Sequence, residues 1–201
     1  MDPDLTLVAG LAANLDRTFP LLVDAHAGRL FTIANRYLGV SSDAEEVAQD
    51  ALVRAYEALA GYDQARITAL RLRPWLATIT LNLARNRRRR IADRRPPASL
   101  EPLMAAGWQP GVASHTLPQA IVERREAQRD LGAALLTLSP AIREALVLRH
   151  VDGLSVAETA AVLGRPEGTI KAQVHRGIAA LRLVLSNPTA SQPNSVKEMT
   201  A

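Results

Sequence analysis

Residues 153–176 constrain the fold more than any other segment, because they combine a short capped helix, a tight turn and a second amphipathic helix. Ser155 and Glu158 have the Ser-x-x-Glu spacing of a capping box, which predicts a helix that starts at Val156. Gly164 comes just after this helix, at the position where a left-handed glycine ends a helix without a steric clash.

The second helix of this segment has one apolar and one polar face. Pro166 and Glu167 suit its first turn, where no amide hydrogen is needed and a carboxylate meets the positive end of the helix. Helical spacing predicts a buried stripe of Ile170, Val174, Ile178 and Leu181. The opposite face carries Thr169, Lys171, Ala172, Gln173, His175 and Arg176. This arrangement predicts a DNA-reading helix-turn-helix. The alternative is an ordinary pair of bundle helices with solvated cations.

Composition predicts an all-α, soluble protein. Nearly half of the 201 residues are hydrophobic, many of them Ala and Leu, while aromatic residues make up only 3%. This mix favours helices. The chain has no cysteine, which excludes disulfides and thiolate metal sites. No segment approaches the ~20 apolar residues of a membrane span, and the N-terminus lacks the basic start of a secretory signal. We therefore expect an intracellular, cytoplasmic protein without membrane insertion.

Charge is unevenly distributed along the chain. Between residues 41 and 60 there are five acidic residues against Arg54, whereas between residues 85 and 95 seven arginines oppose Asp93. Nearly all cations are arginines, whose planar fork suits phosphate groups better than the lysine ammonium does. An acidic face and a basic face on one small protein predict two different partners.

The pattern along the chain predicts two small helical domains joined by a Pro-rich linker. We expect an N-terminal domain over residues 15–92, a flexible linker over 93–119, a C-terminal helix-turn-helix domain over 120–185 and a disordered tail over 186–201. Within the first domain we expect helix ends at Gly39 and Gly61 and a helix between them capped by Ser42 or Asp43. A third helix is expected to open at Pro74, with Trp75, Leu76, Ile79 and Leu83 facing inward.

Two segments of the first domain indicate binding surfaces. The helix over residues 43–59 exposes Asp43, Glu46, Gln49, Asp50, Arg54 and Glu57, either as an ordinary solvated face or as a docking face for a basic helical partner. The run Arg87-Arg88-Arg89-Arg90 favours phosphate binding over a merely exposed helix end. Asn82 and Asn86 lie one turn apart and offer amides to base edges, whereas Trp75 is expected in the core more than on a base.

No catalytic constellation is present in the sequence. The four histidines are His26, His115, His150 and His175, and they are dispersed over different elements without triad or metal spacing. A Gly-rich phosphate loop is also missing. We expect a protein that is not an enzyme and needs no metal or cofactor.

Taken in order, these segments resemble a bacterial RNA polymerase sigma factor of the extracytoplasmic-function class. The resemblance covers roughly residues 19–90 and 120–185. It rests on three segments: Asp43-Ala-Glu-Glu-Val-Ala-Gln-Asp50, Trp75-Leu-Ala-Thr-Ile-Thr-Leu-Asn-Leu-Ala-Arg-Asn86, and Gly153-Leu-Ser through Gly168-Thr-Ile-Lys-Ala-Gln-Val-His-Arg176.

The resemblance implies a role for each segment. Core RNA polymerase would contact Asp43, Glu46, Gln49 and Asp50. The minus-ten promoter element would be melted and read by Asn82, Arg85 and Asn86 together with the loop at 62–73. The minus-thirty-five element would be read by Lys171, Ala172, His175 and Arg176, with Arg149 and Thr169 on phosphates. The resemblance further implies an anti-sigma factor as a partner.

Two departures from the family and two alternatives remain. Gln173 stands where many relatives carry a basic residue, and Arg71-Leu72-Arg73-Pro74 is unusual before Trp75. A stand-alone helix-turn-helix transcriptional regulator would share the C-terminal pattern, but the receiver domain of a response regulator needs alternating strands that the N-terminal half does not predict. A helical protein that binds RNA or a membrane surface through the arginine run would leave the helix-turn-helix unexplained.

Overall fold

The computed structural model describes residues 3–93 and 119–186, and all of its regular secondary structure in these ranges is helical. The predicted all-α fold is confirmed. Except for their terminal residues, the predicted linker and tail lie outside the described residues. The helices are α1 Pro3–Ala13, α2 Leu15–Leu38, α3 Ser41–Ala60, α4 Gln64–Thr68, α5 Leu72–Asp93, α6 Gln119–Thr137, α7 Pro140–Leu146, the π-helix η1 Val147–Val151, α8 Val156–Leu163 and α9 Glu167–Ser186.

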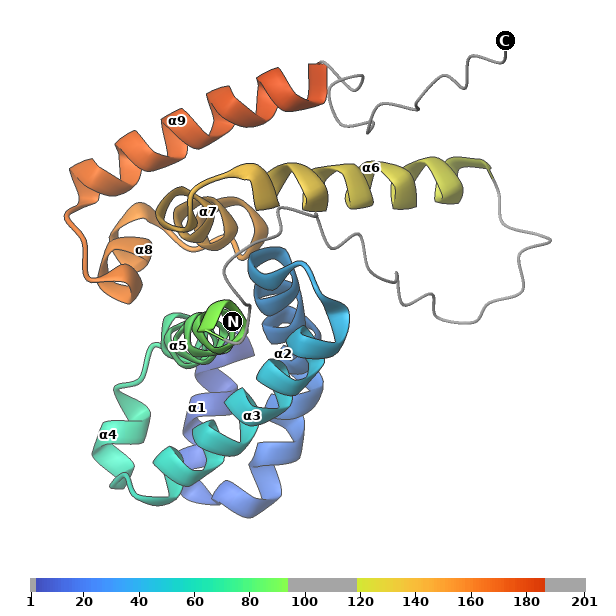
Figure 1. Ribbon diagram of the computed structural model, residues 1–201. Helices are drawn as coiled ribbons and strands as arrows, with labels where there is room; N and C mark the ends of the chain where they lie inside the picture. The colour runs from blue at the N-terminus through green and yellow to red at the C-terminus, as the bar shows by residue number, and fades with distance from the viewer. Residues whose placement is uncertain (1–2, 94–118, 187–201) are drawn as a thin grey trace, which may run out of the picture.

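The helices form two groups that pack against each other (Figure 1). The N-terminal group comprises α1–α5 and the C-terminal group α6–α9. Within the described residues, no helix combines the length and apolarity that a membrane crossing requires.

Helix α1 starts well before the predicted start of the first domain and packs into its core. Val8 and Leu11 are buried in the same apolar cluster as Leu22 and Leu76. The sequence pattern did not predict α1, because its apolar residues run around the helix rather than along one stripe. The short helix α4 was likewise missed, since one and a half turns carry too little periodicity to be read.

The helix ends of the N-terminal group agree with the glycine signals but not with the predicted cap. Gly39 has φ 79° and donates its backbone N–H to the Asn35 carbonyl at 2.8 Å, which ends α2. The prediction that Ser42 or Asp43 caps the next helix is wrong, because α3 begins at Ser41 after Val40 and has no side-chain cap. Helix α5 begins at Leu72, so that Pro74 lies within its first turn rather than at its start.

The predicted helix-turn-helix is formed by α8 and α9. The Ser155 hydroxyl accepts from the Glu158 N–H at 3.1 Å, and the Glu158 carboxylate accepts from the Ser155 N–H at 2.8 Å, so the capping box is confirmed. Gly164 has φ 62°, and α9 begins at Glu167 directly after Pro166. The stripe is confirmed as well: Ile170 is fully buried, while Val174, Ile178 and Leu181 pack half-buried against α6 and α7.

Gln173 corrects the expected outer face of α9. Its side chain is only 8% exposed, and its amide oxygen accepts from the Arg165 guanidinium at 3.2 Å. Gln173 therefore lies on the inner face, three residues after Ile170, where i and i+3 positions share a side of the helix. It is not positioned to read bases, so its departure from the family pattern does not bear on base contacts.

One apolar cluster joins the two groups. Val147, Leu148 and Leu154 of the C-terminal group are buried against residues of α2, α3 and α5. Arg143 adds a buried polar contact, because its guanidinium donates to the Tyr37 carbonyl at 2.7 Å and to carbonyls at the end of α6. The side chains that connect the groups thus include both apolar and charged ones.

Candidate polymerase and nucleic-acid interfaces

The four acidic and amide residues predicted to contact polymerase lie along one side of α3. Gln49 and Asp50 are exposed and form the open half of this face. Asp43 and Glu46, in the first turns of α3, face Arg87 of α5 instead. The Arg87 Nε donates to Asp43 at 2.8 Å, and its terminal nitrogen lies 2.8 Å from the Glu46 carboxylate.

A surface hollow of about 680 Å³ lies between α3 and α5 and contains both predicted asparagines. We call it the α3–α5 hollow. It combines two aromatic rings, two side-chain amides, two charged side chains and an apolar floor. Its lining residues are Arg54, Glu57, Ala58, Tyr62, Trp75, Ile79, Asn82, Leu83 and Asn86.

The aromatic rings give the α3–α5 hollow flat apolar surfaces. Trp75 is half-buried, and its ring centroid lies 6.3 Å from that of Tyr62. The expectation that Trp75 belongs to the core is therefore only partly right, because one side of the residue lines the hollow. Arg66 stacks its guanidinium 3.7 Å from the centre of the Tyr62 ring.

Asn82 and Asn86 each use the amide oxygen within the helix. The Asn82 oxygen accepts from Arg85 at 3.2 Å, and the Asn86 oxygen accepts from Arg89 at 3.3 Å. Both side chains are exposed. This leaves their NH2 groups as the available hydrogen-bond donors toward the hollow.

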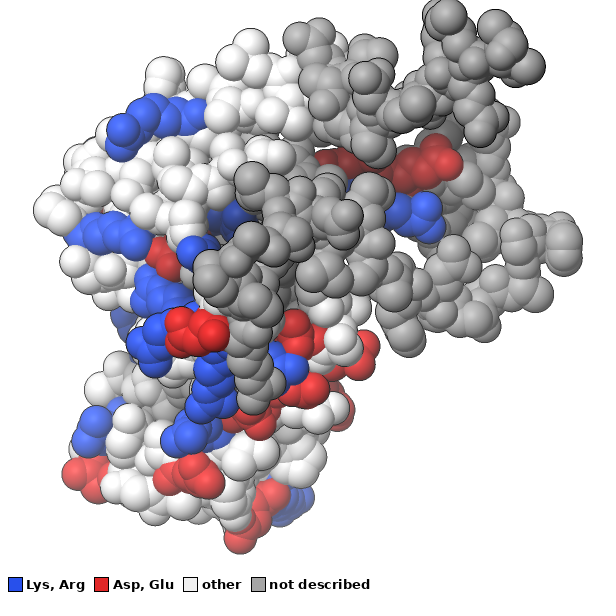
Figure 2. Space-filling view, in the orientation of Figure 1, with Lys and Arg blue, Asp and Glu red and all other residues white. Residues whose placement is uncertain are grey.

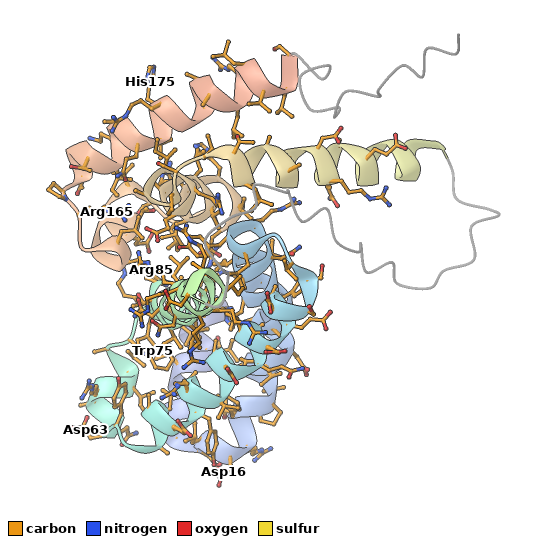
Figure 3. All side chains as sticks on the ribbon, in the orientation of Figure 1. Asp16, Asp63, Trp75, Arg85, Arg165 and His175 are labelled. Atoms are coloured by element: carbon orange, nitrogen blue, oxygen red, sulfur yellow. The ribbon has the colours of Figure 1, made fainter. Side chains whose placement is uncertain are left out.

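Arg85 is not free in this structure. Its Nε donates to the Glu144 carboxylate of α7 at 2.7 Å, and the Arg85 side chain is 33% exposed. The hydrogen bond with Glu144 raises the pKa of Arg85 above its ordinary value despite burial, so the side chain stays charged. Figure 3 shows Arg85 at the boundary between the two groups of helices, with Arg165 on the other side.

The outer face of α9 is open along its length. Thr169, Lys171, Ala172, His175 and Arg176 are all exposed, as predicted. In Figure 3, His175 lies on the side of α9 that points away from the N-terminal group. Arg149, in contrast, is half-buried in η1 and donates to the Leu154 carbonyl, so one of its N–H groups is engaged within the chain.

Sequence reasoning missed the α3 side of the hollow. Arg54 and Glu57 were read as outer-face residues of an acidic helix, and Tyr62 was read as part of a loop. The signal was present in the spacing, because Arg54, Glu57 and Ala58 repeat at three and four residues and share a face. Only the packing of α5 beside α3 shows that this face borders Asn82 and Asn86.

Comparison with known proteins identifies the family. The family model for Sigma-70 region 2 matches residues 22–95, and the model for Sigma-70 region 4 matches residues 128–181. The chain is 31% identical over 169 residues to the ECF RNA polymerase sigma factor SigW of Bacillus subtilis, covering 82% of this chain and 87% of that protein. The chain belongs to the ECF class of RNA polymerase sigma factors.

Two further relatives agree with this assignment. The sigma factor is 30% identical over 184 residues to the ECF RNA polymerase sigma-E factor of Escherichia coli, covering 89% of this chain and 92% of that one. Its fold is similar to the sigma factor RpoE in a co-crystal structure with the anti-sigma factor NepR from Bartonella quintana. The TM-score is 0.62 at 26% identity, over 84% of this chain and 96% of that one. The α3–α5 hollow lies within the region 2 match, and α8 and most of α9 lie within the region 4 match.

Proposed function

We propose that this sigma factor binds core RNA polymerase through α3 and promoter DNA through two separate surfaces, and so directs transcription initiation to specific promoters. The observation that carries this function is the presence of region 2 before region 4 in a single chain. A stand-alone helix-turn-helix regulator needs only the second region, so the match to region 2 disfavours that alternative. The role is one of recognition rather than catalysis, and its place is the cytoplasm, where the polymerase acts.

The polymerase surface we propose is the face of Asp43, Glu46, Gln49 and Asp50. Gln49 and Asp50 are exposed among the described residues and offer an amide and a carboxylate to a basic partner. Arg87 neutralises the other end of the face. The open half, Gln49 and Asp50, is therefore expected to contribute most to binding.

The minus-ten element is assigned to the α3–α5 hollow. Aromatic rings of Tyr62 and Trp75 suit the face of an unstacked base, since stacking is available to every base. Asn82 and Asn86 add amide donors that can read a base edge. Arg85 lies one turn from Asn82 and is assigned to the phosphate backbone beside the hollow.

The minus-thirty-five element is assigned to the outer face of α9. Lys171, His175 and Arg176 supply donors for base edges, while Ala172 can contact a thymine methyl group but cannot form a hydrogen bond. Thr169 and the free N–H groups of Arg149 are assigned to phosphates. This is the geometry in which a recognition helix enters the major groove while its partner helix crosses the backbone.

We further propose an anti-sigma factor as a regulatory partner, because the similar structure of RpoE contains one. The division into a first domain over 15–92, a linker over 93–119 and a second domain over 120–185 is kept as a proposal, and the burial of Val8 and Leu11 supports adding α1 to the first domain.

Size-exclusion chromatography of the purified chain with sigma-free core polymerase tests the function directly. Comigration supports the docking face and makes promoter selection with the reconstituted holoenzyme the next step. Separate elution of a folded chain would contradict a sigma function and favour a regulator that reads DNA through α8 and α9 alone.

A further inference from the structure

A row of arginines lines the side of the N-terminal group that faces α7 and α8. We call it the arginine row: Arg29 of α2, Arg71 just before α5, and Arg73 and Arg85 of α5. Three carboxylates of the C-terminal group, from Asp152, Glu158 and Glu144, lie opposite this row. On the face shown in Figure 2, blue and red side chains gather where the two groups meet.

Asp152 is the most buried of these carboxylates, with a side chain that is 0% exposed. Arg29 donates to its carboxylate at 2.5 Å. Arg73 donates to its backbone carbonyl at 2.5 Å, and the Arg73 carbonyl accepts from Arg29 at 3.2 Å. Asp152 therefore ties α2 and the start of α5 to the turn between η1 and α8.

Glu144 makes the second contact across the boundary. Its carboxylate lies 2.7 Å from Arg85 of the N-terminal group and 2.7 Å from Arg165 of its own group, and its side chain is 4% exposed. The Arg85 guanidinium is thereby engaged by Glu144, although Arg85 borders the asparagines of the α3–α5 hollow. The third contact is open to solvent, because Arg71 is 74% exposed where it lies 3.0 Å from Glu158.

An arginine fork binds a carboxylate and a phosphate with the same geometry. We propose that the arginine row is one anion-binding surface with two alternative occupants: the carboxylates of the C-terminal group in the free chain, and promoter DNA phosphates once that group moves away. The carboxylates of Glu144, Asp152 and Glu158 thus occupy the positions that DNA phosphates take in the open chain.

This inference rests on the proposed function, since it extends the minus-ten surface to Arg29, Arg71 and Arg73. It also means that the chain's own carboxylates occupy only one of the two proposed DNA-binding surfaces in the free chain. The reading face of α9, with Lys171 and His175, stays exposed while Arg85 is paired with Glu144. The apolar cluster around Val147 and Leu148 must be uncovered when the groups separate, so binding to a partner has to compensate for the lost contact.

The chain lacks cysteine, which allows its opening to be measured with two engineered labels. Ala60→Cys on α3 and Ala179→Cys on α9 place donor and acceptor dyes at exposed positions of the two groups. In this background, Glu144→Gln and Arg85→Gln each remove the ion pair between the two groups, and Glu144→Gln also removes the ion pair of Glu144 with Arg165 of its own group. Asp24→Asn removes one negative charge at an exposed site of α2 and serves as the matched control for net charge.

Each variant is tested for energy transfer and for binding to a short, dye-labelled single-stranded DNA of mixed sequence by fluorescence anisotropy. We expect both Glu144→Gln and Arg85→Gln to lower energy transfer. Only Glu144→Gln should tighten DNA binding, by up to about tenfold if about one free chain in ten is open. Circular dichroism verifies that each variant is folded.

Three results would overturn the proposal. Energy transfer that stays unchanged in Glu144→Gln would mean that the ion pair does not hold the groups together. Equal tightening by Glu144→Gln and Arg85→Gln would exclude Arg85 as a phosphate contact. Tightening by Asp24→Asn as large as that by Glu144→Gln would reduce the effect to net charge. Failure to comigrate with core polymerase is a separate result. It would refute the proposed function, but it would not affect the energy-transfer and DNA-binding measurements, which use the free chain.

Discussion

Arg87 of α5 donates a hydrogen bond of 2.8 Å from Nε to the carboxylate of Asp43 on α3. The first arginine of the basic run is therefore held against the first carboxylate of the acidic helix. Among the described residues, Asp50 at the other end of that face forms no ion pair. The acidic face is divided into a neutralised half and an open half, and the two halves are expected to respond differently to substitution.

Replacing Gln49 and Asp50 together with alanine should weaken binding to core polymerase by about tenfold or more, equivalent to about 1.4 kcal/mol. Both side chains are exposed, so the fold should be unaffected. The dissociation constant is measured with labelled chain and core enzyme, with Asp24→Asn as the control. An unchanged constant in the double variant would exclude this half of α3 as the docking face.

Replacing Lys171 or Arg176 with alanine should weaken recognition of a selected promoter by about 1–3 kcal/mol for each base contact, while core binding remains intact. Arg182 provides the matched control, because it is an exposed cation further along α9. The measurement is transcription and promoter affinity of reconstituted holoenzyme. Equal losses in all three variants would indicate a general effect of charge rather than base reading.

Ser155→Ala should destabilise the chain by about 1 kcal/mol, because it removes the N-cap hydrogen bond of α8. Ser42→Ala should have no such effect, since α3 has no side-chain cap. Thermal and urea unfolding of the two variants compare a cap that the structure contains with one that only the sequence predicts. A similar loss in both variants would contradict the observed start of α3.

Gly177→Ala should destabilise the packing of α9 on α7. A β-carbon there would come 2.5 Å from the Leu146 side chain and 2.7 Å from that of Ile142, and such overpacking costs roughly 1–3 kcal/mol. Gly168→Ala adds its methyl group in open space and should be neutral or stabilising. The unfolding midpoints of the Gly177→Ala and Gly168→Ala variants are compared. A stable Gly177→Ala variant would mean that α7 and α9 separate easily.

Acid should weaken the contact between the two groups through Glu144. Burial alone would raise its pKa, but the hydrogen bonds and charges of Arg85 and Arg165 outweigh burial and hold the pKa below the ordinary 4.5. The folded pKa is lowered, so the stabilisation is complete above pH 4.5 and is lost as the pH falls through the folded pKa. Urea unfolding at a series of pH values should show a smaller acid loss in Glu144→Gln than in the parent. If the stability of the parent and of Glu144→Gln fell equally with decreasing pH, Glu144 would not be the group through which acid acts.

Local signals were sufficient to predict the helix-turn-helix. The capping box at Ser155, the turn at Gly164 and the stripe from Ile170 each depend on neighbours within a few residues, which the sequence displays directly. Gln173 was misassigned although the same rule of three and four applies to it, because a polar side chain was taken as a surface residue. Its hydrogen bond to Arg165 is what makes burial acceptable.

The contacts between distant segments could not be predicted in this way. Nothing near Arg85 in the sequence indicates that Glu144 lies against it, and nothing near Asp43 points to Arg87, because both pairs depend on how whole helices pack. For the same reason the sequence predicted the α5 side of the α3–α5 hollow but not its α3 side. Charge runs indicated anion and cation binding, whereas only the packing shows which charges satisfy each other.

Helix α3 carries Asp50 of the proposed docking face and Glu57 of the hollow on a single uninterrupted element. The two residues are seven positions apart, which is two turns or ~10 Å of rise. If polymerase binds at the first and an unpaired base lies beside the second, as proposed, the length of α3 sets the distance between the two surfaces. A kink introduced at Val53, between these two residues, should therefore change the spacing of the two proposed surfaces without altering any residue of either.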